Sequence, residues 1–385
     1  MRKGLLMIPG PTQVPPQVFQ AMSVPMINHR GAEFEEALGK VISSLKCLLN
    51  TKADILIFPG SGTGAMEAAA VNLVSPGEEV AVITVGAFGD RFAQILEAHG
   101  AAVHRIEFPW GAPADPSTVK RFFDTHHGVK CCFLTHNETS TGVLNEVKRI
   151  RQAIPEQVLV VVDAVSSLGA TPIAQDEWGL DVVVTASQKA LMVPPGLAVL
   201  SVNERAMKKS SEVSTGRYYW DFRLAKKFFD KPRPQTPYTP AVSLVLGLEA
   251  ALKLIEEEGL ERVYRRHAVL ARGVRQAMRA IGLEVLAPEE VASPSVTAVK
   301  APGGLASKTI ISAVRQKFGV VLAGGQGHLT DKIFRIGHIG YVSWSDVLVA
   351  VAAVEMALHD LGCPVRLGSA AEAVEHAVTG EGTAK

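Results

Sequence analysis

The chain has 385 residues, 47% of them hydrophobic, which is enough for two domains with substantial cores. Its 39 lysine and arginine residues balance 38 acidic residues, which argues against nucleic acid or an anionic membrane surface as a partner and favours a small substrate. No apolar run approaches the ~18 residues of a membrane span, and the start is too short for a signal-peptide core. The four cysteines lack C-x-x-C spacing, so we expect reduced thiols and a cytoplasmic protein.

The first part of the chain alternates helical and strand patterns. After a proline-rich arm over residues 1–16, residues 33–50 carry apolar side chains at helical spacing. Seven strand-like runs follow from residue 55, reading "ILIF", "VAVITV", "VHRIEF", "CCFLT", "VLVVVD", "DVVVTAS" and "LAVLSV". Continuous apolar strands are typical of a parallel sheet covered on both faces. We therefore predict a large α/β domain over residues 17–240, with a mostly parallel sheet between helices.

The pattern changes after the last of these runs. Residues 203–240 carry aromatic, basic and proline residues without strong periodicity, and a loop of that length is usually functional or part of an interface. A long helix then leads into a mixture of helices and strands, which predicts a smaller C-terminal α+β domain over residues 241–385. For the tail, residues 366–385, we expect one weak helical turn or more that then frays.

A lysine stands where a buried strand ends, in "DVVVTASQKALMVPPG" over residues 181–196. Apolar residues and two prolines follow Lys189, so a charged amine there would lose hydration that an ammonium group holds tightly. That cost is avoided if the amine is neutral, paired or covalently bonded. The alternative is a surface lysine whose stem alone packs on the protein.

Two more features accompany the lysine. "ILIFPGSGTGAMEAAA" is a strand, a glycine-rich turn and a helix, which suits a phosphate, with hydroxyl donors at Ser61 and Thr63. It lacks the G-x-G-x-x-G fingerprint of dinucleotide sites, and a plain tight turn is the alternative. Asp163 ends the strand "VLVVVD", either as a ligand-facing acid or as a cap. Together the three match pyridoxal phosphate, which needs a lysine for its aldehyde, an acid at its ring nitrogen and a cradle for its phosphate.

At this point the sequence resembles the class V aminotransferases of pyridoxal-phosphate fold type I, in the alanine–glyoxylate and serine–glyoxylate (serine–pyruvate) branch. The motifs that carry the resemblance are "THNETSTGVL", "VDAVSSLGATP" and "SQKALMVPPG". It implies a large domain with a seven-stranded sheet and a smaller C-terminal domain. It also implies transamination between a small amino acid, alanine or serine, and a small 2-oxo acid, glyoxylate or pyruvate, in a homodimer with shared active sites.

The resemblance implies a role for each matching residue. Lys189 looks like the Schiff-base lysine and proton carrier, and Asp163 like the partner of the ring nitrogen. Arg335 in "KIFRIGHIG" matches the arginine that grips the substrate carboxylate, and Gly10 belongs to an arm that closes over the substrate. The remaining implied cofactor contacts are Ser61, Gly62, Thr63, Phe88, Thr139, Val165, Gln188 and, reaching the neighbouring subunit, Thr236. Phe88 departs from the family, where tryptophan is common, and so lacks an indole donor.

Other functions stay open at this stage. A cysteine desulfurase-like lyase would need a cysteine on a mobile loop, and none of the four qualifies. A nicotinamide-dependent oxidoreductase would need the missing fingerprint. A non-catalytic domain would keep the fold alone. The histidines and cysteines over residues 126–136 do not have convincing metal-ligand spacing, so we expect no metal. His29 and Arg30 are either pocket residues or caps, and Arg335 without the resemblance would be an exposed strand residue.

Overall fold

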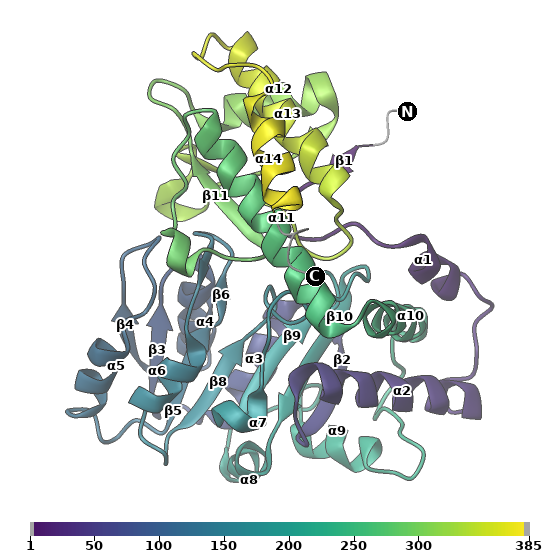
Figure 1. Cartoon of the computed structure of the whole chain (residues 1–385). Coiled ribbons are helices and arrows are strands. Elements are labelled where there is room, and N and C mark those ends of the chain that lie inside the picture. The colour runs from purple at the N-terminus through teal and green to yellow at the C-terminus, as the bar shows by residue number, and fades with distance from the viewer. Residues whose placement is uncertain (1–3, 381–385) are drawn as a thin grey trace.

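The seven apolar runs form one sheet in the structure, a computed structural model that describes residues 4–380 (Figure 1). The strand order is β2-β10-β9-β8-β5-β3-β4. The strands are β2 (Asp54–Gly60), β3 (Glu79–Thr84), β4 (Ala102–Glu107), β5 (Cys131–Thr135), β8 (Leu159–Asp163), β9 (Val182–Ala186) and β10 (Gly196–Val202). Only β10 runs antiparallel to its neighbours, whereas the other pairs are parallel. The predicted mostly parallel, seven-stranded sheet is confirmed.

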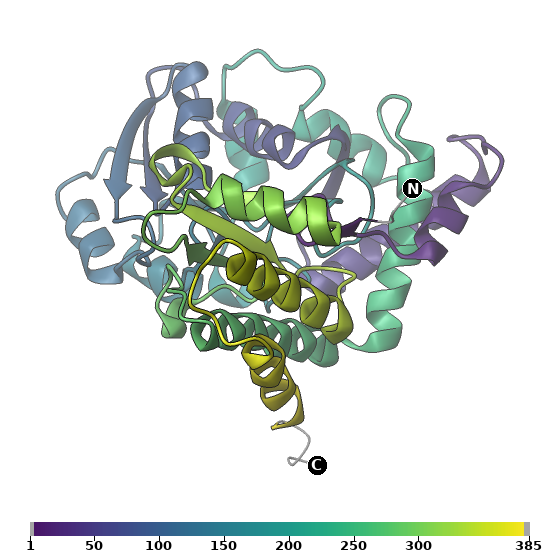
Figure 2. The same cartoon turned by 90° about the horizontal axis from the view of Figure 1, so that it is seen from above.

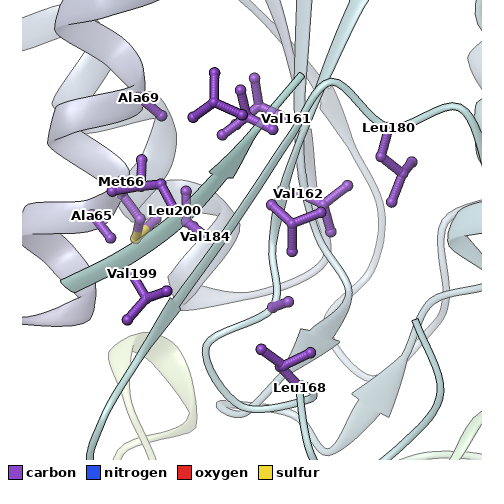
Figure 3. Close-up of a cluster of buried hydrophobic side chains, with 14 of the residues drawn as sticks. Ala65, Met66, Ala69, Val161, Val162, Leu168, Leu180, Val184, Val199 and Leu200 are labelled. Carbon is purple, nitrogen blue, oxygen red and sulfur yellow. The ribbon is translucent and has the colours of Figure 1, made fainter. Parts of the chain in front are cut away.

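Helices cover this sheet because its strands are apolar on both faces. The helices of this region are α1 (Pro16–Met22), α2 (Ala32–Leu49), α3 (Gly62–Leu73), α4 (Ala87–Ala98), α5 (Pro116–Phe123), α6 (Val147–Ala153), α7 (Gln175–Trp178) and α10 (Val242–Glu258). Alanines on α3 let it lie close to β9 and β10, and Figure 3 shows Ala65, Met66 and Ala69 beside Val184, Val199 and Leu200. Each fully buried valine or leucine contributes about 1.5–3 kcal/mol, so this layer supplies much of the stability.

A second, antiparallel sheet lies in the C-terminal half of the chain (Figure 2). Buried side chains of this region form a hydrophobic core separate from that of the large sheet. Its strands are β11 (Val296–Lys300), β14 (Ile333–Gly337) and β13 (Ala323–Gly324), and its helices are α11 (Leu260–Ala280), α12 (Ser307–Phe318), α13 (Trp344–Asp360) and α14 (Ser369–Thr379). The tail, for which the sequence predicts one weak helical turn or more, forms the helix α14, which packs along α11 with Ala370, Val374 and Ala377 buried. The division at residues 16 and 240 stays a prediction.

The N-terminal arm joins this second region. Its strand β1 (Leu5–Leu6) pairs in parallel with β12 (Val320–Val321). The backbone N–H of Gly337 then donates to the carbonyl of Met7 at 2.8 Å. Within residues 4–380, every helix is too short or too polar to span a lipid bilayer.

The stretch over residues 203–240 contains two helices that the sequence did not indicate. These are α8 (Glu204–Glu212) and α9 (Phe222–Phe229). The side chain of Asn203 accepts from the N–H of Ala206 at 2.9 Å, and Asp221 accepts from Arg223 and Leu224 at 2.8 and 3.0 Å. Both helices are therefore stabilised by side-chain caps. Such caps are a local sequence signal that does not depend on helical periodicity.

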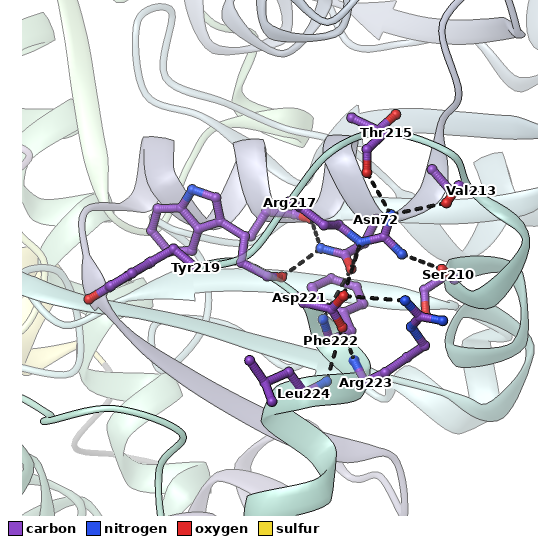
Figure 4. A network of polar contacts seen from close by, with 12 residues as sticks. Asn72, Ser210, Val213, Thr215, Arg217, Tyr219, Asp221, Phe222, Arg223 and Leu224 are labelled. Carbon is purple, nitrogen blue, oxygen red and sulfur yellow. Dashed lines mark hydrogen bonds and ion pairs between the residues drawn. The ribbon is translucent and has the colours of Figure 1, made fainter.

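The connection between α8 and α9 is held by one buried asparagine of α3 (Figure 4). Asn72 Oδ1 accepts from Arg217 Nε at 2.7 Å and from the Phe222 N–H at 3.1 Å, while its Nδ2 donates to the Trp220 carbonyl at 2.7 Å. Arg217 also donates to backbone carbonyls, among them that of Ser210. This network fixes Trp220 relative to the start of α3.

Candidate active site

Lys189 lies just beyond β9, at the carboxyl end of the parallel strands. Its half-buried amine donates to the carbonyl of Pro9 at 2.7 Å. Burial lowers the pKa of Lys189 from its usual 10.5 to about 8, although the nearby charge of Asp163 acts in the opposite direction. A substantial fraction of this amine is therefore neutral near pH 8, which is the nucleophilic form.

Asp163 ends the neighbouring strand β8 and is buried. One carboxylate oxygen, Oδ1, accepts from the N–H of Val165 at 2.8 Å. Burial raises the pKa of Asp163 to about 7, and the negative charge of Glu138 adds to the rise, while Lys189 and Arg91 oppose it. Asp163 forms no ion pair within residues 4–380, so a cation brought close to it would favour its charged form.

The glycine-rich turn begins α3 as expected. Ser61 is the N-cap residue, and its hydroxyl accepts from the N–H of Gly64 at 3.3 Å. Within residues 4–380, the N–H groups of Gly62 and Thr63 bind no protein acceptor, as is usual at a helix start. The free donors and the positive helix end favour an anion here.

Close contacts explain two of the glycines. A Cβ on Gly62 would lie 2.9 Å from a methyl group of Val165, and one on Gly64 would lie 3.0 Å from the indole of Trp220. Val165 therefore lies next to the glycine-rich turn. Gln188 comes directly before the lysine, and its buried side-chain oxygen has no hydrogen-bond partner in residues 4–380. A buried carbonyl oxygen without a partner favours a ligand or water with a hydrogen-bond donor at this place.

Phe88 lies in the first turn of α4, beside a residue that the sequence analysis missed. The guanidinium carbon of Arg91 lies 4.7 Å from the centre of the Phe88 ring, within cation–π range. Its Nη1 also approaches the hydroxyl of Thr63 at 3.4 Å. Arg91 therefore adds positive charge next to the glycine-rich turn, where the sequence offered only backbone and hydroxyl donors.

Thr139 and Arg335 meet on the other side of the site. The Thr139 hydroxyl shares a 2.7 Å hydrogen bond with Ser166, and its carbonyl accepts from Arg335 Nη1 at 3.0 Å. Arg335 is 7% exposed, so the reading of an exposed strand residue is wrong. Its Nε donates to the Gly324 carbonyl at 2.9 Å, and Nη2 makes no hydrogen bond to residues 4–380. Burial lowers the pKa of Arg335 to about 10, so it stays charged at neutral pH.

The N-terminal arm covers the lysine. A Cβ on Gly10 would lie only 2.4 Å from the Lys189 amine nitrogen, so a side chain here would displace the end of the lysine, and the φ of +143° also disfavours any residue but glycine. The backbone N–H of Thr12 donates to the Gln188 carbonyl at 3.1 Å, and its hydroxyl donates to the Lys189 carbonyl at 3.0 Å. The arm is therefore part of the site.

Thr236 is the predicted residue that the chain does not bring to this cluster. Its hydroxyl donates to the Tyr238 carbonyl at 2.7 Å, and its own carbonyl accepts from Arg30 at 2.5 Å. Within residues 4–380, no hydrogen bond joins Thr236 to Ser61 or Thr63. Arg30, whose role the sequence left open, here anchors the Thr236 loop.

The cysteines lie away from the cluster. Cys131 and Cys132 are buried in β5, and burial raises the pKa of Cys131 to about 12, which disfavours a reactive thiolate. No group of three metal-ligating side chains occurs in the described part of the chain.

Comparisons with known proteins agree with this geometry. A family model described as aminotransferase class-V matches residues 5–338. A soluble hydrogenase small subunit of Synechococcus is 42% identical over 94% of each chain. An L-aspartate–glyoxylate aminotransferase of Paracoccus denitrificans is 38% identical, covering 96% of this chain and 95% of the relative. A serine–glyoxylate aminotransferase of Methylorubrum extorquens is 37% identical, covering 94% and 93%.

Among solved structures, the ureidoglycine–glyoxylate aminotransferase of Bacillus subtilis superimposes with a TM-score of 0.94 at 28% identity. The match covers 98% of this chain and 99% of that chain.

The lowered pKa of Lys189 is testable in the ligand-free protein. Because the pKa is about 8 instead of 10.5, labelling of Lys189 by an amine-specific reagent should rise with a midpoint near pH 8. Exposed lysines, followed by peptide mass spectrometry in the same sample, should react fully only at higher pH. Asp163→Asn should move the midpoint lower, because it removes the charge that raises the lysine pKa. A profile for Lys189 that matches the exposed lysines would contradict the assignment.

Proposed function

The chain belongs to the class V aminotransferases, which use pyridoxal phosphate, and we propose that it moves an amino group from a small amino acid to glyoxylate or a similar 2-oxo acid. The observation that carries the proposal is the convergence of a half-buried amine, Lys189, with Asp163 and the start of α3 at one end of the sheet. The donor that we favour is alanine or serine.

The residues at the site fit the cofactor. The free N–H groups of Gly62 and Thr63 and the hydroxyl of Ser61 suit a phosphate, and we propose the side-chain NH₂ group of Gln188 as a further donor to it. We propose that Phe88 and Val165 contact the two faces of the ring, that Thr139 lies beside the ring oxygen, and that Asp163 binds the ring nitrogen. A protonated ring nitrogen would hold Asp163 in its charged form, against the effect of burial.

Two side chains, Lys189 and Arg335, would act on the substrate. Bound pyridoxal phosphate supplies an aldehyde that accepts the amino group and a ring that takes up electrons. Lys189 would hold the aldehyde, and its amine would take up or give the proton at the substrate Cα, for which a pKa of about 8 is well matched. Arg335 Nη2, which has no protein acceptor in residues 4–380, binds the substrate carboxylate and orients the Cα–H bond.

Glyoxylate as the acceptor is supported by the names of three relatives. The proteins from Paracoccus, Methylorubrum and Bacillus all carry glyoxylate in their names but differ in the amino donor. A buried arginine that binds only the carboxylate leaves the side chain of the donor less constrained. We therefore propose a single acceptor, glyoxylate or a similar 2-oxo acid, but a wider range of amino donors. A cytoplasmic location is part of the proposal, supported by four cysteines that are all free.

The function is tested by fixing the cofactor to the protein. Borohydride treatment of the yellow, cofactor-loaded protein should attach the pyridoxyl group to one peptide, that of Lys189. Gly10→Ala should abolish or greatly reduce this attachment, because its Cβ would lie 2.4 Å from the amine nitrogen. Gly282→Ala is the matched control, since Gly282 also has a positive φ, of +80°, but no atom within 4 Å of a new Cβ. Attachment to another lysine would contradict the proposal.

Arg335→Ala tests the carboxylate site. Losing even one charged hydrogen bond should lower kcat/KM for alanine about tenfold or more, while cofactor affinity changes little. Arg335→Lys should recover only part of the activity, because an ammonium group lacks the planar fork. An amine without a carboxylate should show a much smaller defect. Arg275→Ala is a control for loss of a buried arginine, since Arg275 is 8% exposed and binds Glu289. Equal losses of kcat/KM for alanine and for the amine without a carboxylate would show that Arg335 has only a structural role.

We also propose a homodimer in which Thr236 reaches the phosphate of the partner. It is supported by the position of Thr236 away from its own turn and by large exposed apolar side chains nearby, such as Tyr218, 78% exposed. Sedimentation should show a dimer, and Thr236→Val should weaken cofactor binding. A fully active monomer would show that the sites are not shared.

A further inference from the structure

Glu138 is a buried carboxylate to which the reaction assigns no role. It stands in the short strand β6 (Asn137–Glu138) with no measurable exposure. Its Oε2 accepts from the N–H groups of Phe88 at 3.1 Å and Gly89 at 3.2 Å. Its Oε1 accepts from the N–H and the hydroxyl of Ser140, at 3.0 and 2.5 Å. All of these donors are neutral, and they belong to three residues in or beside the active site: Phe88, Gly89 and Ser140.

The carboxylate is held without a direct cationic partner. Within residues 4–380, no lysine, arginine or histidine nitrogen forms an ion pair with Glu138. Burial raises the pKa of Glu138, while the donors from Ser140, Gly89 and Phe88 oppose the rise. The first turn of α4 supplies the compensating positive end of a helix. A charge kept in this way is costly, which calls for an explanation beyond filling space.

Glu138 connects two parts of the site that come from distant segments. On one side it holds the backbone of Phe88, whose ring we place on the cofactor. On the other side it holds Ser140 and so orders the turn that contains Thr139, whose carbonyl accepts from Arg335 at 3.0 Å. Glu138 also lies near enough for its charge to act on both Asp163 and Arg335.

The side chains of Glu138 and Ser140 are tightly packed against the start of α4. A Cβ on Gly86 would lie 2.5 Å from two carbons of the Glu138 side chain and 2.5 Å from the Ser140 hydroxyl. That hydroxyl in turn accepts from the N–H of Ala87 at 3.0 Å. Glu138 and Ser140 therefore fill the space at the start of α4. Their contacts fix the position of this helix relative to the turn that contains Thr139.

We propose that Glu138 is a positioning residue that sets both the plane of the Phe88 ring on the cofactor and the place of the Thr139 carbonyl that anchors Arg335. The proposal rests on the roles given above to Phe88 and Arg335. It adds a residue that touches neither cofactor nor substrate but couples the binding of the two.

Glu138→Gln is the informative variant. Glutamine has nearly the same shape, but its amide nitrogen replaces one of the two accepting oxygens and would face N–H donors. Either the start of α4 or the Thr139 turn must therefore move away from residue 138. The dissociation constant of pyridoxal phosphate, followed by absorbance, should rise about tenfold, the factor expected from one lost hydrogen bond to a charged group. The visible circular dichroism of the bound cofactor should change, because the ring plane changes. KM for the carboxylate-bearing donor should rise as well.

A matched control separates positioning from stability. Glu355 is a second buried carboxylate, 3% exposed, which accepts from the N–H groups of Gly368 and Ala370, each at 2.8 Å, and from the Ser369 hydroxyl at 3.3 Å. It holds the start of α14 in the C-terminal region. Glu355→Gln should lower thermal stability about as much as Glu138→Gln but leave cofactor affinity, visible circular dichroism and KM unchanged.

Gly86→Ala disturbs the same contacts of Glu138 and Ser140 without removing the carboxylate. It provides a second test if Glu138→Gln does not fold. Its methyl group would displace Glu138 and Ser140, so it should reproduce the change in circular dichroism and the weaker cofactor binding. If Glu138→Gln and Gly86→Ala both bind the cofactor with the parent affinity and spectrum, or if Glu355→Gln changes them equally, the inference is overturned. If the unsubstituted protein binds no pyridoxal phosphate, the proposed function fails first, and this inference with it.

Discussion

Charged groups gathered at the carboxyl end of the sheet are held by backbone atoms and not by one another, and the active site depends on this constraint. Lys189 donates to the Pro9 carbonyl, Asp163 accepts from the Val165 N–H, and Arg335 donates to the carbonyls of Gly324 and Thr139. A direct ion pair between acid and amine would hold both in their charged forms. With backbone partners instead, burial brings the pKa values of Asp163 and Lys189 toward neutrality, to about 7 and about 8.

The fold was predictable because its signal is repeated along the chain. Six of the seven strands of the large sheet are largely apolar, as strands covered on both faces must be, whereas the edge strand β4 carries His104, Arg105 and Glu107. Strand ends then indicate where a ligand binds, so Lys189 and Asp163 stood out from position alone. The start of α3 carried a third local signal in its glycines and its cap, Ser61.

The rest of the site arises from contacts between distant segments, which local patterns do not encode. Arg91 reaches Thr63 only because α3 and α4 lie side by side, and Trp220 reaches the glycine-rich turn only through its network with Asn72. Arg335 has no unusual sequence neighbours, and its burial follows from strand β14 meeting the Thr139 turn. The helices α8 and α9 are a different case, because their caps at Asn203 and Asp221 were visible in the sequence.

The pairing of β1 with β12 has a consequence for how the protein is made. Residues 5 and 6 are synthesised long before their partners at 320 and 321. The carbonyl of Pro9 that holds the Lys189 amine therefore reaches its place only after most of the chain exists, although the large sheet has all its strands by residue 202. Such long-range closure makes the last folding step slow relative to local structure. A nascent chain thus contains every strand of the large sheet before the segment that anchors the Lys189 cover has been made.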